Sequence, residues 1–91
     1  MSSKILSKIQ NDIIGLGMSL MAETRTNDVT KLVVCLSGLN IPRATIANIV
    51  KAETGTTLSV NRITKIRSAY SSIVKTLSEE TDHLYQFHDI A

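Results

Sequence analysis

The chain of 91 residues contains no tryptophan, two tyrosines and one phenylalanine. Its apolar positions are filled mainly by isoleucine, leucine and valine, so any core must be aliphatic. Proteins that bind single-stranded nucleic acid commonly stack the bases on aromatic faces, and three aromatic residues offer little for such a platform. Recognition of unpaired bases by stacking is therefore not expected.

Cysteine is equally scarce. The single Cys35 lies in the apolar run 32–36, where we expect a small buried side chain. One cysteine forms no internal disulfide, which fits a reducing cytosol. The first residues lack the basic start and apolar segment of a signal peptide, and no apolar run approaches the length that spans a bilayer. We therefore expect a soluble, cytoplasmic protein with no membrane partner.

Signatures of catalysis are missing as well. The sequence has no glycine-rich phosphate loop, no nucleophile elbow and no Cys/His pair. His83 and His88, with Asp82 and Asp89 beside them, are five residues apart, which suits solvated histidines better than a metal site on one helical face. We expect no enzymatic activity, no metal and no cofactor.

Charge is distributed unevenly along the chain. Up to Ser78 ten lysines and arginines face four acidic residues, a net charge of +6, whereas residues 79–91 hold four acids and no lysine or arginine, a net charge of −4. A basic body with an acidic end suits a protein that binds a polyanion, and a solvated charged surface is the alternative.

Apolar spacing predicts a single all-α domain of four or five helices, with long helices at both ends. In the first, from Lys4 to about Glu23, apolar residues recur at spacings of 3, 4, 3 and 4. They are Leu6, Ile9, Ile13, Leu16 and Leu20. This stripe predicts either a core helix or a dimerisation helix. Gly15 and Gly17 indicate a kink or a close helix crossing in it.

The middle of the chain predicts two helices joined by a very short turn. An apolar helix begins near Val29, with Thr26, Asn27 or Asp28 available as its cap. Asn40 tolerates the left-handed conformation that turns a chain out of a helix. Pro42 fits the first turn of a second helix, which extends to about Glu53 and is ended by Thr54 and Gly55.

A last long helix is predicted from Val60 to about Glu79, with Ser59 as its cap. Residues 80–91 are expected to form an acidic tail or a short helix. The predicted organisation is thus one helical domain over residues 1–79, followed by the acidic end.

The central segment resembles the helix-turn-helix of many bacterial, phage and plasmid regulators over residues 32–51. The resemblance rests on Leu36, Leu39, Asn40, Ile41, the segment 42–46 and Ile49. It implies a helix-turn-helix at about 29–53 in a homodimeric regulator of transcription, a repressor, that binds double-stranded DNA. Two copies would read half-sites about one helical turn apart.

Carried over by position, the resemblance assigns to the DNA side the residues Pro42, Arg43, Ala44, Ala47, Asn48 and Lys51. Arg43 suits a bidentate contact to guanine and Asn48 to adenine, whereas Thr45 and Lys51 suit phosphates. The last helix adds Arg62, Lys65 and Arg67 as phosphate contacts.

Three alternatives remain at the level of the sequence. The last helix is a rival reader of the bases, with Asn61, Arg62 and Lys65 near its start. A different class of function is a helical module that dimerises or docks on another protein without touching nucleic acid, and RNA binding is a third.

The order of the helices also resembles the C subunit of the bacterial flagellar master activator. That resemblance implies a second protein subunit as a further partner. The subunit carries a cysteine-ligated zinc site, which this chain cannot build with Cys35 alone.

Overall fold

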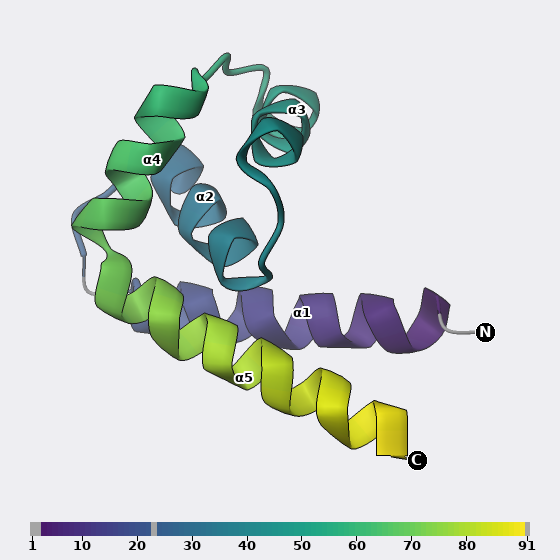
Figure 1. Cartoon of the computed structure of the whole chain (residues 1–91). Helices are drawn as coiled ribbons and strands as arrows, with labels where there is room; N and C mark the ends of the chain where they lie inside the picture. Colours follow the sequence, from purple (N-terminus) through teal and green to yellow (C-terminus); the bar gives the residue numbers. More distant parts are fainter. Residues whose placement is uncertain (1–2, 23, 91) are drawn as a thin grey trace.

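The computed structural model describes residues 3–22 and 24–90, and the side chains of residues 8–22 and 24–84. Within this part the chain forms five α-helices and no strand, which confirms the predicted all-α class. The helices are α1 (Ser3–Leu20), α2 (Asp28–Gly38), α3 (Arg43–Thr54), α4 (Val60–Ala69) and α5 (Ser71–Ile90) (Figure 1).

The central helix is α2, which packs against each of the other four. Its last six residues, 33–38, are all buried. A helix at a protein surface buries only one side, and α2 departs from that pattern because neighbours enclose it. Asn27 caps its first turn, since Oδ1 of Asn27 accepts the N–H of Thr30 at 2.8 Å. This bond confirms one of the three predicted caps.

The other helices form two groups around α2. α1 and α5 contact each other along one side of α2, and α3 and α4 contact each other on another (Figure 1). Among the described residues, α3 contacts only α2 and α4. The aliphatic core joins the groups, with Ile9, Ile46, Val50, Ile63 and Leu77 at most 1% exposed.

Two glycines allow close helix crossings in the α1–α2–α5 layer. A Cβ on Gly17 would lie 2.5 Å from Sγ of Cys35, and a Cβ on Gly38 would overlap Cβ of Leu77. Gly15, in contrast, faces open space within the described part of the chain. Of the two predictions for the glycines of α1, the close crossing therefore holds at Gly17.

The long helix predicted for residues 60–79 is wrong in one respect, because the chain bends at Tyr70. Tyr70 has φ −116° and ψ 33°, its N–H still donates to the carbonyl of Ile66, and a new helix starts at Ser71. The bend lets α4, with Ile63 buried, contact α2 and α3, while Leu77 of α5 lies beside Gly17 of α1 and Gly38 of α2. α5 then continues through Ile90, so the predicted boundary at residue 79 falls inside a helix and residues 80–90 form neither a tail nor a separate short helix.

Candidate nucleic-acid interface

The turn between α2 and α3 is short and left-handed at one residue. Asn40 has φ 62°, which confirms its predicted role. The N–H groups of Leu39, Asn40 and Ile41 donate back to carbonyls of α2, so the turn is closed by backbone hydrogen bonds. Pro42 is extended, with ψ 147°, and precedes the first helical residue, Arg43. Pro42 therefore lies one position earlier than predicted, outside the first turn of α3.

Helix α5 holds this turn from one side. The hydroxyl of Ser78 donates to Oδ1 of Asn40 at 2.8 Å, and Nδ2 of Asn40 donates to Asp82 at 3.3 Å. The buried hydroxyl of Thr81 donates to the carbonyl of Gly38 at 2.9 Å, near the end of α2 where carbonyls lack helical partners. Both the backbone and the side chain at the turn are thus fixed by residues about 40 positions further along the chain.

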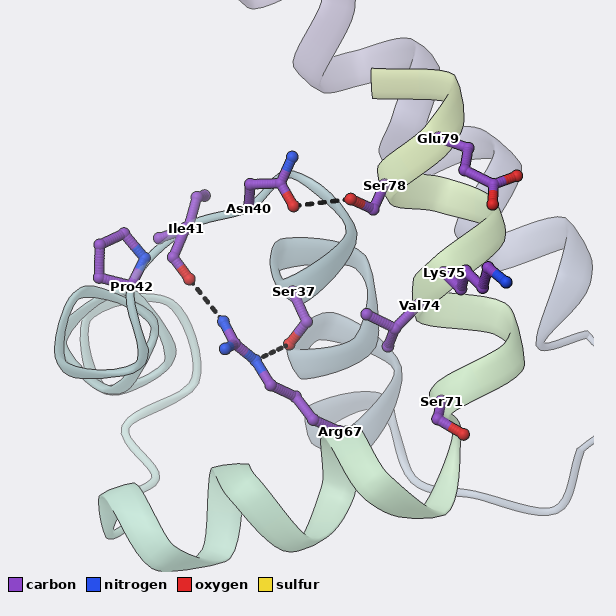
Figure 2. Close-up of a pocket in the computed structure, with 10 residues that line it drawn as sticks. All are labelled: Ser37, Asn40, Ile41, Pro42, Arg67, Ser71, Val74, Lys75, Ser78 and Glu79. Carbon is purple, nitrogen blue, oxygen red and sulfur yellow. Dashed lines mark hydrogen bonds between the residues drawn. The ribbon is translucent and has the colours of Figure 1, made fainter. Parts of the chain in front are cut away.

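Arg67 of α4 holds the same turn from the other side (Figure 2). Its Nε donates to Oγ of Ser37 at 2.9 Å, and its Nη2 donates to the carbonyl of Ile41 at 2.6 Å. Burial lowers the pKa of the Arg67 guanidinium, and the charge of Arg43 lowers it further. The Nε and Nη2 donors of Arg67, which were predicted to meet a DNA phosphate, thus point inward to the turn (Figure 2).

The outward side of α3 carries most of the residues assigned to DNA. Ala44, Thr45, Asn48 and Lys51 are exposed there, opposite the fully buried Ile46 and Val50. Ala47 is different, because it is half-buried and packs against the core. Its place on the DNA side is corrected accordingly. The exposed side of α3 thus combines small or uncharged side chains with two cations, Arg43 and Lys51, and one acid, Glu53.

The two basic residues of α3 are engaged with the loop and helix that follow. Nη1 of Arg43 donates to Oγ1 of Thr64 on α4 at 2.6 Å. Nζ of Lys51 donates to Oγ1 of Thr57 at 3.0 Å and to the carbonyl of Gly55 at 3.4 Å. Both side chains stay exposed, and their partners are uncharged oxygens, so no acidic partner neutralises either positive charge in these bonds.

Helix α4 presents a more polar surface than α3. Oγ of Ser59 accepts the N–H of Arg62 at 3.1 Å, which confirms the predicted cap. Beyond this cap Asn61, Arg62, Lys65 and Ser68 are exposed, and α4 contains no acidic residue. Ile63 and Ile66 hold the opposite side of the helix in the core.

The three helices α2, α3 and α4 form a unit in which each contacts the other two. α3 follows α2 after a sharp turn, and α4 follows α3 after the loop 55–59, where Gly55 is left-handed at φ 75°. α4 is therefore the third helix of a unit of three mutually packed helices. Thr64, which positions Arg43, was missed from the sequence because a lone threonine gives no signal there.

The predicted dimerisation stripe on α1 divides between the core and the surface. Ile9 and Ile13 are each 1% exposed and pack inside their own chain, so they are not available to a partner and are corrected to core residues. Leu16 is partly buried against the same core, whereas Leu20 is 41% exposed. Leu6 lies outside the residues whose side chains the structure describes.

The described residues hold no group of three or more His, Cys, Asp or Glu side chains that could bind a metal ion. His83 is exposed, and the side chains of His88 and Asp89 lie outside the described ones. Cys35 is fully buried, and burial raises the pKa of its thiol. In the part of the chain that the structure describes, no helix is both long and apolar enough to cross a membrane.

The chain matches no protein-family model, no curated protein and no solved structure. Residue geometry alone therefore has to support any functional conclusion.

Proposed function

We propose that this protein binds double-stranded DNA through the outward sides of α3 and α4 and regulates transcription. The observation that carries this proposal is the pairing of these helices, which are joined by the bond between Arg43 and Thr64. Together they expose Arg43, Lys51, Arg62 and Lys65 against a single acidic residue, Glu53. Such a surface suits the phosphate backbone of a duplex.

Within this surface we assign the reading of bases to α4 and backbone contacts to α3. α4 is the third helix of the α2–α3–α4 unit, the position that enters the major groove in three-helix DNA-binding domains. It spans ten residues, about 15 Å, and exposes asparagine, arginine and lysine side chains that pair with base edges or phosphates. We thus favour the alternative from the sequence, in which the helix beginning at Val60 reads the bases, over the helix-turn-helix assignment to residues 42–53.

The regulator would act as a homodimer on a palindromic operator, because a surface this small needs a second copy to reach enough bases. We propose further that it is a repressor and acts in the cytoplasm. A protein-interaction module is the second candidate. Met18 and Leu20 favour it, since they are 37% and 41% exposed near the end of α1. Sedimentation at micromolar concentration tests the homodimer, because a strict monomer would contradict the symmetric operator.

Salt dependence tests DNA binding itself. We expect the affinity for a 20–30 base-pair duplex, measured by fluorescence anisotropy, to fall with salt at a log–log slope of about −0.9 for each phosphate contacted. Arg62→Ala and Lys65→Ala should each weaken binding, by about 1–3 kcal/mol where a base contact is lost. Lys8→Ala is the matched control, because Lys8 is exposed on α1, which contacts neither α3 nor α4 within the described chain. No binding at low salt would refute the proposal.

The reading helix is tested by two matched asparagines. Asn48 on α3 and Asn61 on α4 are both exposed and uncharged. After selection of a preferred duplex from a random pool, we expect Asn61→Ala to relax the preference at one base pair, at a cost of about 1–3 kcal/mol on that duplex. Asn48→Ala should leave the selected sequence unchanged. The opposite pattern would return the reading role to α3.

A further inference from the structure

An open groove lies between the loop that leads into α2 and one side of α4. Arg25, Asn27 and Thr30 line it from the loop and the start of α2, and Arg62 and Lys65 line it from α4. Three cations from two distant parts of the sequence thus converge on one hollow. The sequence alone indicates no role for Arg25, because a single arginine in a polar loop belongs to no recognisable motif.

The described lining of the groove carries charge of one sign. It holds Arg25, Arg62 and Lys65 and no acidic residue, and Asp28, which directly follows Asn27 in the sequence, is exposed at the start of α2 and is not part of the lining. Converging like charges disfavour the folded state unless solvent or an anion screens them. An arrangement of this kind stabilises a bound anion directly.

The loop that carries Arg25 is ordered by its own hydrogen bonds. Oγ1 of Thr24 donates to the carbonyl of Met21 at 2.7 Å and lies 2.9 Å from Oγ1 of Thr26. Asn27 then caps α2 through the N–H of Thr30. The backbone at Arg25 is therefore held on both sides, which reduces the conformational entropy that the loop would lose on binding a ligand.

The groove and Arg43 lie on opposite sides of α4. Consecutive residues of an α-helix are rotated by about 100°, so Arg62 and Thr64, two positions apart, point about 160° apart around the helix axis. Arg62 lines the groove, and Thr64 binds Arg43. A helix lying in the major groove of DNA has a phosphate backbone along each side, and cations flank α4 on both sides, Arg62 from α4 itself and Arg43 from α3.

We infer that the groove of Arg25, Arg62 and Lys65 binds a backbone phosphate of one DNA strand, while Arg43 meets a phosphate of the other strand. This inference rests on the proposed function. The two phosphate contacts would fix the position of α4 across the major groove of DNA. Neither contact carries sequence information itself.

The test uses Arg25→Ala in the full chain with the selected duplex. We expect weaker binding on every sequence, a salt slope smaller in magnitude by about 0.9, and an unchanged base preference. Methylphosphonate substitution, one position at a time, then locates the contact. In the wild type, neutralising the contacted phosphate should weaken binding. The Arg25→Ala variant should bind the duplex with and without that substitution equally well. The Arg43→Ala variant should be insensitive instead to substitution at a phosphate of the opposite strand.

Two results would overturn the inference. The first is an Arg25→Ala variant with wild-type affinity and slope, while the wild type binds duplex DNA. The second is loss of sensitivity on the same strand for Arg25→Ala and Arg43→Ala. If the wild type binds no duplex, the proposed function and the DNA phosphate fail together. Titration with inorganic phosphate, followed by NMR at Arg25 and Thr30, then decides whether the groove binds anions at all.

Discussion

Replacement of Gly38 by alanine is expected to lower the free energy of unfolding by about 2–3 kcal/mol. The new Cβ would overlap Cβ of Leu77, and both atoms are fixed by their backbones, so no change of rotamer relieves the contact. α2 and α5 must move apart, which loosens the packing of a fully buried leucine. Thermal unfolding measures the effect, at about 4–8 °C for each kcal/mol in a domain of this size.

Gly15→Ala is the matched control. Gly15 lies in α1 with open space where its Cβ would be, so the higher helix propensity of alanine should raise the stability by up to about 1 kcal/mol. Gly17→Ala should be destabilising, and Cys35→Ala in the same chain should relieve it, because Sγ of Cys35 is the atom that the new Cβ meets. A Gly38→Ala protein as stable as the wild type would contradict the close crossing of α2 and α5.

Replacement of Arg67 by alanine is expected to destabilise the fold by about 2 kcal/mol. Its removal leaves the carbonyl of Ile41 and the buried hydroxyl of Ser37 without their donors, and an unpaired buried polar group costs about 1–3 kcal/mol. The α2–α3 turn should loosen as a result, and α3 with it. Urea unfolding followed by circular dichroism measures the change in midpoint.

Arg67→Lys separates this structural role from a phosphate contact. Lysine keeps the charge but has one ammonium group in place of the planar fork that reaches Ser37 and Ile41 together. If Arg67 only contacted DNA, lysine would preserve most of the affinity and neither variant would change the urea midpoint. We expect instead that lysine lowers the midpoint nearly as much as alanine does. An unaltered midpoint in both variants, with weaker DNA binding, would restore the phosphate role.

The ends and turns of the helices were predictable because their causes are local. Asn27 and Ser59 cap the helices that follow them, and Asn40 takes the left-handed conformation, as their residue types favour. Each feature depends on atoms within a few positions of the residue. The class of the fold was predictable for the same reason, since the apolar periodicity of each helix is a local pattern.

The bend at Tyr70 was not predictable because the apolar register continues through it. Ile66, Tyr70 and Ile73 follow the spacing of one helix, although the structure divides them between two. The bend depends on the positions of α1 and α2, and the spacing of apolar residues gives no information about those positions. Ile9 and Ile13 were ambiguous for a related reason, since the same stripe suits a core or a dimer interface.

The candidate site was predictable in part. Arg62 and Lys65 are exposed as expected for residues that meet a polyanion. Arg67, two positions after Lys65, looked the same in sequence but points inward, because its partners Ser37 and Ile41 come from a turn about 30 residues earlier. A cation on an amphipathic helix can be assigned to solvent or to an internal bond only when the neighbouring helices are known.

The course of α5 separates the acids near its end from the cations of α3 and α4. Residues 42–78 hold six cations and one acid, whereas the four acids of residues 79–91 follow along a helix that runs away from α4 and does not contact α3 (Figure 1). A polyanion at a distance of one or two Debye lengths would turn the protein before touching it, since one end is attracted and the other repelled. If the protein binds DNA as proposed, this separation of charge would favour encounters in which α3 and α4 face the duplex.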